Sequence, residues 1–246
     1  MEAPHTKRME NAIHNWMKNL DNYPGWEDWK REQFGRTIWY NSPTQKSSIV
    51  PDEFEFSPEM ESQHSLCYLF LALQEAVISL REVEYYFRRY PFKNLPVTRY
   101  SHLTNVCEMY FNRFYEFKSR LKKYFNALKA VAPDHGLDIG KFIKQYDAVF
   151  DQELRERNSI NHHRRFDDLA IDHLAVTHMM GIERADLGWD KEHLFSYRKI
   201  TKQWVERVRA RSLVLDKFVE AIAEATLKTC DFLEQNSEYK ARENLN

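Results

Sequence analysis

The chain has 246 residues, enough for one large domain or for one domain with an extension. A content of 43% hydrophobic and 14% aromatic residues excludes a mainly disordered chain, and only six glycines favour helices over a turn-rich β fold. The net charge of −1 provides no field that would hold a long nucleic acid or an anionic membrane, so any contact with RNA must come from a local patch.

Residues 1–57 are expected to form an N-terminal extension. This segment carries four of the six tryptophans, Trp16, Trp26, Trp29 and Trp39. Its aromatic residues follow no long period, which indicates an arm packed on the main domain or, alternatively, a surface for a protein partner. Ile38–Tyr40 and Ser48–Val50 are expected to pair as a short hairpin around Asn41-Ser42-Pro43.

The sequence predicts a soluble, cytoplasmic protein without a membrane segment. The N-terminus is polar and lacks the apolar centre of a signal peptide, and the longest apolar run, Leu66–Leu73, is too short to cross a bilayer. Cys67, Cys107 and Cys230 are far apart on apolar helical stretches, which favours buried, reduced thiols.

Two long helices are predicted after the extension. The first begins at Ser57-Pro58-Glu59, where serine caps and proline suits the first helical position, and it ends before Pro91. The second spans Arg99–Val131 and ends before Pro133. Their apolar positions recur at helical spacing, at Leu66, Leu69, Leu73, Val77, Leu80 and Phe87 in the first helix and at Leu103, Val106, Tyr110, Phe114, Phe117, Leu121, Phe125 and Leu128 in the second.

A third helix is predicted from Ile139 to Arg157. Its buried face is Ile143, Tyr146, Phe150 and Leu154, and one further step of three reaches Arg157, so this arginine is expected along the core stripe. Because Asn158, Ser159 and Asn161 are poor helix residues, we expect the helix to end or bend there.

Two more helices complete the expected bundle. The fourth covers Phe166–Met180, with Gly181 as its C-cap, and the last runs from Ser196 to Leu233. The expected architecture is an all-α, up-and-down helical bundle over residues 58–235, preceded by the tryptophan-rich extension and followed by a polar tail, residues 236–246.

The candidate functional residues lie in the stretch RERNSINHHRRFDD, residues 155–168. Arg157-Asn158-Ser159-Ile160-Asn161-His162 reads R-N-x-x-x-H, and His163 satisfies the same pattern with one more intervening residue. The pattern resembles the signature of the HEPN superfamily, helical bundles that include metal-independent ribonucleases, toxins and defence proteins. The resemblance covers Ser57–Leu233 in architecture, but only these six or seven residues in motif.

The chemistry of the pair fits RNA cleavage. An imidazole can take the proton of a 2′-hydroxyl that attacks the adjacent phosphorus, and a forked guanidinium can hold two phosphate oxygens as they gain charge. We therefore predict Arg157 and His162 as catalytic residues, with His163 as the rival base. No metal and no cofactor are required.

Geometry imposes a condition on this site. Side chains five positions apart on a straight α-helix point about 140° away from each other. Arg157 and His162 converge on one phosphate only if the helix breaks between them or if two subunits face each other. The family resemblance implies a composite cleft in a dimer, so we expect a homodimer that binds RNA, and a protein partner such as an antitoxin is compatible with it.

Each residue has a structural alternative. Arg157 could pair with a buried acid, and His162 and His163 could be capping or exposed turn residues. Asn158 and Asn161 could orient the imidazole or bind phosphate, or could simply cap a helix. The remaining basic residues could form an RNA-binding rim, or a salt-bridged face with Glu156, Asp167 and Asp168; they are Arg155, Arg164 and Arg165.

Other activities lack their motifs. His173 and His178 are five apart, which is the wrong spacing for a shared metal site, and His173 is expected to be a core histidine. No Gly-rich phosphate loop or nucleophile elbow is present. The two remaining hypotheses are a metal-independent endoribonuclease and a non-catalytic HEPN-like module for dimerisation or nucleotide binding.

Overall fold

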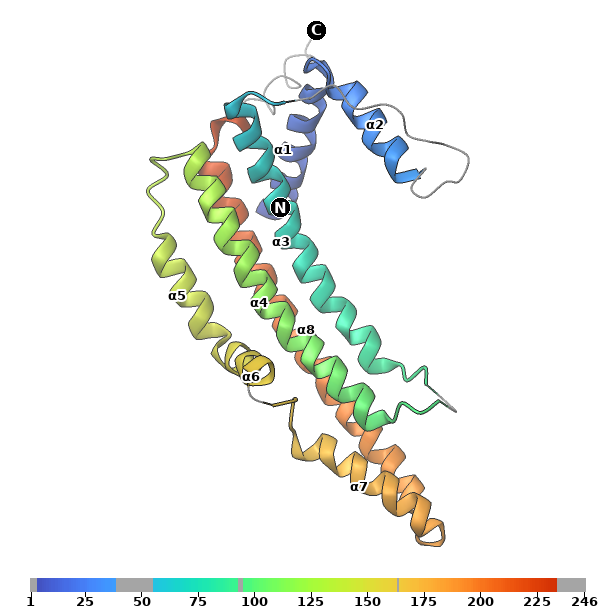
Figure 1. Ribbon diagram of the computed structural model, residues 1–246. Helices are drawn as coiled ribbons and strands as arrows, with labels where there is room; N and C mark the ends of the chain where they lie inside the picture. The colour runs from blue at the N-terminus through green and yellow to red at the C-terminus, as the bar shows by residue number, and fades with distance from the viewer. Residues whose placement is uncertain (1–3, 39–54, 93–94, 163, 234–246) are drawn as a thin grey trace. The chain divides into compact units, whose positions relative to one another are not determined.

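The computed structural model describes residues 4–38, 55–92, 95–162 and 164–233, and within these ranges it is helical without any strand (Figure 1). The all-α prediction is therefore confirmed. The helices are α1 (His5–Asn19), α2 (Trp26–Ile38), α3 (Pro58–Arg88), α4 (Arg99–Val131), α5 (Ile139–Val149), α6 (Asp151–His162), α7 (Leu169–Glu183) and α8 (Trp189–Thr229), with short 3₁₀ turns at Leu20–Asn22 and Ala185–Leu187.

The helices group into two compact units. The first unit comprises residues 1–68, 127–135 and 220–246, and the second comprises residues 69–126 and 136–219. We expected an extension ending at residue 57 beside one bundle; instead α1 and α2 group with the ends of α3, α4 and α8. The predicted hairpin lies outside the described residues, apart from Ile38, which ends α2, and so does the polar tail.

The first unit contains an amphipathic helix that the sequence analysis missed. Met9, Ile13, Trp16 and then Leu20 are buried at helical steps of three and four. Trp16 donates from Nε1 to Oε1 of Gln63 on α3 at 2.9 Å. Helix α1 has no capping side chain of its own, and the carboxylate of Glu220 on α8 accepts from its backbone amides instead. Within its described residues, the expected N-terminal arm contains two helices, which the sequence analysis did not predict.

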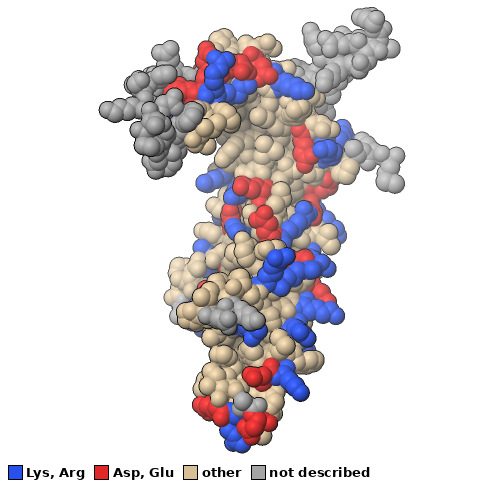
Figure 2. All heavy atoms as spheres, turned by 90° about the vertical axis from the view of Figure 1, so that its right-hand side faces the viewer, with Lys and Arg blue, Asp and Glu red and all other residues tan. Residues whose placement is uncertain are grey.

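Charge and thiols agree with the expectations from composition. On the face drawn in Figure 2, basic and acidic side chains are interspersed. None of the helices in the described ranges combines the length and the apolar character that a bilayer crossing requires. The three cysteines are buried and free, and burial raises the pKa of Cys67 to about 12 and that of Cys230 to about 11.

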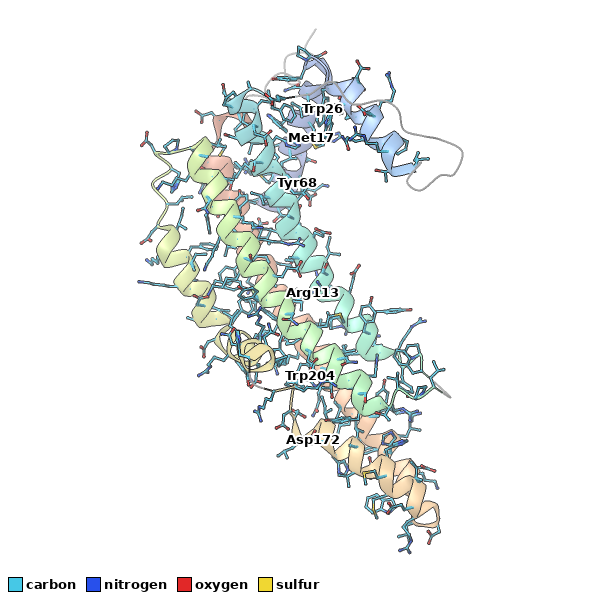
Figure 3. The ribbon with its side chains drawn as sticks, in the orientation of Figure 1. Met17, Trp26, Tyr68, Arg113, Asp172 and Trp204 are labelled. Carbon is cyan, nitrogen blue, oxygen red and sulfur yellow. The ribbon has the colours of Figure 1, made fainter. Side chains whose placement is uncertain are left out.

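The second unit is a helical bundle built around α3, α4 and α8. The predicted bounds of α3 and α4 are confirmed, and Ser57 caps α3 by accepting from the amide of Met60 at 3.3 Å. Helices α3 and α4 run in opposite directions (Figure 1). Trp204 of α8, labelled in Figure 3, stacks on Phe87 of α3 at 5.3 Å and meets Phe111 of α4 edge-on at 5.9 Å.

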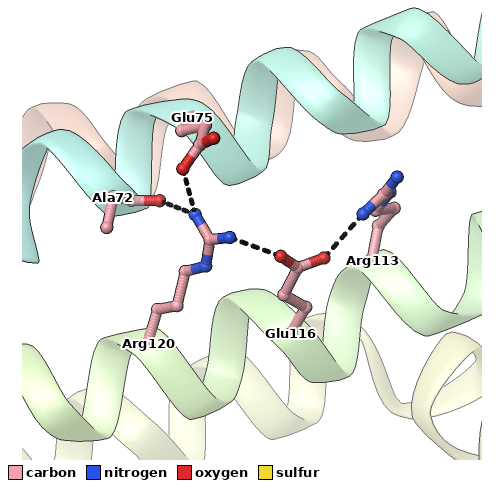
Figure 4. A network of polar contacts seen from close by, with 5 residues as sticks. All are labelled: Ala72, Glu75, Arg113, Glu116 and Arg120. Atoms are coloured by element: carbon pink, nitrogen blue, oxygen red, sulfur yellow. Dashed lines mark hydrogen bonds and ion pairs between the residues drawn. The ribbon is translucent and has the colours of Figure 1, made fainter. Parts of the chain in front are cut away.

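A polar network joins α3 to α4 at the surface of this unit (Figure 4). Arg120 of α4 donates to the carbonyl oxygen of Ala72 at 2.5 Å and to Glu75 at 2.9 Å, both on α3. Arg120 also donates to Glu116 at 2.5 Å, and Arg113 donates to the other oxygen of Glu116 at 2.8 Å. Because these groups reach solvent, the network contributes modestly to stability and mainly sets the register of the two helices.

The prediction of one continuous third helix from Ile139 to Arg157 is wrong, because the structure has two helices there and the second ends later. The backbone leaves helical geometry at Phe150, with φ −111° and ψ 23°, which separates α5 from α6. Phe150 is fully buried, and its ring lies 4.8 Å from that of Tyr146 and 5.0 Å from that of Phe114. Helix α6 then continues through Asn158 to His162, where we expected an interruption. Tertiary contacts override the low helix propensity of these residues.

A buried carboxylate anchors α6. Because the break at Phe150 changes the register, Glu153 rather than Leu154 points into the core, and it is fully buried. Its Oε1 accepts from Tyr110 of α4 at 3.2 Å, from Arg207 of α8 at 3.0 Å and from Arg211 of α8 at 2.9 Å. Within the part of the chain that the structure describes, its Oε2 has no hydrogen-bond partner. Burial, with the nearby Glu153 charge, raises the pKa of Tyr110, so its hydroxyl remains a donor.

Helices α7 and α8 form the remaining part of this unit. Asp168 caps α7 by accepting from the amides of Ala170 and Ile171 at 3.0 and 3.1 Å. The expected C-cap at Gly181 is wrong, because α7 continues to Glu183. Gly181 is buried, and a Cβ there would lie 2.7 Å from Oδ1 of Asp190, so a larger residue would require the Asp190 side chain to move. Helix α8 begins at Trp189 instead of Ser196, directly after Gly188, which has a φ of 78°.

Glu153→Gln is expected to destabilise the protein by about 3 kcal/mol, because two half-buried guanidiniums lose their shared counter-charge. Urea unfolding followed by circular dichroism measures this loss. The matched control is Glu75→Gln, which removes an exposed carboxylate from the α3–α4 network and is expected to cost less than about 1 kcal/mol. Equal losses in the two variants would contradict an anchoring role for Glu153.

Candidate functional site

The motif residues lie on α6 and on the link that follows it. Helix α6 carries Arg155, Arg157, Asn158, Asn161 and His162, whereas Arg164 and Arg165 follow it. His163 lies outside the described residues. Arg157 is four positions after the buried Glu153, so it occupies the same face of α6 one turn later. This face directs the arginine toward α4.

The guanidinium of Arg157 is stacked on an aromatic ring. Its central carbon lies 3.7 Å from the centroid of the Tyr115 ring on α4. Nη1 donates to Oδ1 of Asn158 at 3.3 Å. The amide of Asn161 satisfies its neighbours when its oxygen faces Arg157, and this oxygen then accepts from Nε at 2.9 Å and from Nη2 at 2.8 Å.

The partners of Arg157 are all uncharged. Within the described residues no carboxylate pairs with it, so the expected alternative of an arginine locked onto a buried acid is wrong. The side chain is half-buried, and its plane is fixed by the Tyr115 ring and two amides. The guanidinium is therefore held in a fixed orientation while no acid balances its positive charge. Such a group suits an anionic ligand.

His162 does not share this position. It is exposed and is the last residue of α6. Because α6 is unbroken between Arg157 and His162, the two side chains leave the helix about 140° apart. A break between the two residues was one of the two routes to convergence, and the structure removes it. Convergence on one phosphate therefore requires a second copy of the chain.

The two asparagines act on the arginine. Asn158 and Asn161 both accept from Arg157, so they orient the guanidinium, and neither is a terminal cap of α6. The flanking arginines form ion pairs. Arg155 pairs with Asp151 at 2.5 Å and Arg164 with Asp167 at 2.8 Å.

Arg165 is tied to α4. It donates to Glu108 at 3.2 Å and to Asn105 at 2.5 Å. Arg155, Arg164 and Arg165 are thus salt-bridged, as the structural alternative expected. Of the acids it named, only Asp167 is a partner in the described ranges, and Asp151 and Glu108 stand where Glu156 and Asp168 were expected.

Helix α7 carries His173 and His178, and His193 lies near the start of α8. His173 is exposed, and its Nε2 lies 3.6 Å from Glu192, so the expectation of a core histidine is wrong. The rings of His178 and His193 lie 5.6 Å apart. Across the described ranges, no group of three or more potential metal-ligating side chains gathers in one place.

Sequence reasoning missed the two features that support the motif. Tyr115 lies beside the buried Phe114 but off the apolar stripe of α4, so spacing alone did not connect it with Arg157. Glu153 carried no signal, because an acid on a helix usually faces solvent. No family model, curated protein or solved structure matches the chain.

Arg157→Ala is expected to change the free energy of unfolding by less than about 1 kcal/mol, because it removes an aromatic contact at a partly exposed site and leaves no buried charge. Arg207→Ala is the matched comparison and is expected to cost about 3 kcal/mol, since the buried Glu153 loses a partner. Urea unfolding of both variants checks the difference. A large loss in Arg157→Ala would indicate that the residue is structural.

Proposed function

We propose that the chain is a metal-independent endoribonuclease of HEPN type, in which Arg157 binds the scissile phosphate and His162 acts as general base. The observation that carries this proposal is the fixed, unneutralised guanidinium of Arg157 on the ring of Tyr115. An arginine that binds a phosphodiester needs a positive charge that no acid balances and a side chain with a fixed orientation. Arg157 has both properties, because its partners are an aromatic ring and two amides.

The proposed reaction uses the RNA's own nucleophile. His162 takes the proton of a 2′-hydroxyl, the 2′-oxygen forms a bond to the adjacent phosphorus, and the bond from phosphorus to the 5′-oxygen breaks. The 5′-oxygen takes up a proton from water as it leaves, and His162 later returns its proton to the solvent. The products are a 2′,3′-cyclic phosphate and a 5′-hydroxyl. Arg157 stabilises the charge that gathers on the phosphate oxygens, and DNA is excluded because it lacks the nucleophile.

The active unit would be a homodimer, because the unbroken α6 turns Arg157 and His162 of one chain apart. Two copies related by two-fold symmetry can place Arg157 of one copy beside His162 of the other. Helix α7, which follows α6 after a short link, supplies a surface for this contact. It exposes an apolar face along one side, with Leu169 89% exposed, together with Val176, Met179 and Ile182.

A second function is favoured by the same helix geometry. Since Asn158 and Asn161 both bond to Arg157, the motif also ties α6 to Tyr115 of α4. The alternative is a non-catalytic bundle whose motif fixes α6 and which binds a nucleotide or a second copy without cleaving RNA.

Purified protein is expected to cleave single-stranded RNA in excess EDTA and to leave 2′,3′-cyclic phosphate ends. Arg157→Ala and His162→Ala should each reduce the rate at least about 100-fold, the usual contribution of a positioned acid–base group or charge donor. Arg164→Ala is the control, because Arg164 is an exposed, salt-bridged arginine near the motif. Absence of cleavage with every RNA would favour the non-catalytic alternative.

Mixing the two inactive variants tests the composite cleft. If Arg157 and His162 meet across a dimer, random exchange of Arg157→Ala and His162→Ala subunits should restore about a quarter of the wild-type rate, because half of the dimers then hold one intact cleft of two. A double variant, Val176→Glu with Met179→Glu, should yield monomers in sedimentation and abolish cleavage. Leu213→Glu, at an exposed leucine of α8, is the matched control. Cleavage by a wild-type monomer would contradict the composite cleft.

A further inference from the structure

The second unit contains an aromatic pocket where α3 ends and α4 begins. It has a volume of about 920 Å³, within the size range of small-molecule sites. Its walls include Tyr85, Tyr86 and Tyr90 from the end of α3 and just beyond it, Phe92 from the following link, and His102 and Met109 from α4. It does not include Arg157 or His162, and nothing in the proposed reaction uses it.

One guanidinium at this pocket resembles that of Arg157 in its surroundings. Arg89 lies with its central carbon 4.7 Å from the centroid of the Tyr85 ring. Within the described residues, no carboxylate pairs with Arg89, and no acidic residue is among those that line the pocket. Tyr85 is 54% exposed, so an outer part of its surface remains available for contact. The pocket thus joins aromatic surface to an unneutralised cation.

The floor of the pocket is held in place by its own hydrogen bonds. The hydroxyl of Tyr90 donates to the carbonyl oxygen of Val97. Nε2 of the buried His102 donates to the carbonyl oxygen of Tyr86 at 3.0 Å, at the end of α3. The rings of Tyr90 and Phe92 pack edge-on against His102 at 5.7 and 5.6 Å. A ligand therefore meets a preformed surface and needs to order little of it.

The rim of the pocket adjoins the segment that follows the motif. Asn105, which lines the pocket, accepts from Arg165, three residues after His162. Arg165 also donates to Glu108, so its charge is partly neutralised. Arg89 is the cation among the residues that line the pocket, and the guanidinium of Arg99 lies 5.0 Å from the centroid of the Tyr90 ring. The hydrogen bond of Asn105 places the pocket and the chain after α6 on one continuous part of the second unit.

We infer that this pocket binds an unstacked nucleobase, with Arg89 contacting a phosphate attached to the same nucleotide. Aromatic side chains recognise bases by stacking, and an arginine without an acid favours the adjacent phosphate. A cationic ligand would be repelled by Arg89, and a purely aliphatic one would leave this charge unused. The base belongs to single-stranded RNA or to a free nucleotide; the first source rests on the proposed function.

Two probes separate the sources. One is a short single-stranded RNA with 2′-O-methyl groups throughout, which cannot be cleaved because its nucleophile is blocked, and its binding is followed by fluorescence anisotropy. The other is AMP, followed by calorimetry. Tyr85→Ala should weaken binding by about 5- to 100-fold, the effect of removing one base–aromatic stack. Arg89→Ala should weaken binding and reduce the slope of log affinity against log salt by about one for the RNA.

Tyr68→Ala is the matched control, because Tyr68 is also an exposed tyrosine on α3, at 65% against 54% for Tyr85, and does not line the pocket. Pocket-dependent binding of AMP with no such dependence for the RNA supports the site and names a free nucleotide as its occupant. Equal behaviour of Tyr85→Ala and Tyr68→Ala with both probes overturns the inference. If RNA is still cleaved in that case, only the proposal of a nucleotide-binding pocket is overturned. If binding depends on Tyr85 but no RNA is cleaved, only the proposal of an endoribonuclease is overturned.

Discussion

The buried carboxylate of Glu153 is the interaction on which the second unit depends. One oxygen accepts from a tyrosine of α4 and from two arginines of α8, so a single acid joins three helices. Removing a carboxylate from water is costly, and only the surrounding donors make this position tolerable. The cost fixes the rotation of α6, because turning the helix would leave Glu153 without its partners. The rotation in turn decides where Arg157 lies.

Arg207 and Arg157 differ in whether an acid pairs with them, and this difference separates a structural arginine from a candidate functional one. Arg207 and Arg157 both lie against tyrosine rings, but Arg207 also pairs with Glu153, whereas Arg157 contacts only amides beyond its ring. Arg207 therefore has its charge balanced inside the protein and serves the fold. Arg157 keeps an unbalanced charge in a fixed direction. Such a group stabilises little and is available to an external anion.

Two surfaces of the second unit also present groups that the fold of one chain leaves exposed. Helix α7 is apolar on its inner side, where Ile171 and Leu174 are buried, and also on its outer side, around Val176 and Met179. A helix with apolar side chains on opposite sides is usually covered on both. The aromatic pocket next to Arg89 is likewise not needed for packing within one chain. Both surfaces have a role in the dimer and in the nucleotide site that we propose.

The sequence by itself determined the helical class, the bounds of α3 and α4, the buried thiols and the location of the motif, because periodic apolar spacing and capping residues are local signals. It missed α1, although Met9, Ile13 and Trp16 carry the same spacing. Only the tertiary structure decided that the chain breaks at Phe150, that α6 continues to His162, and that Glu153 is buried. These outcomes depend on Tyr110, Tyr115, Arg207 and Arg211, which are distant in sequence, and no local pattern specifies which distant side chain a residue will meet.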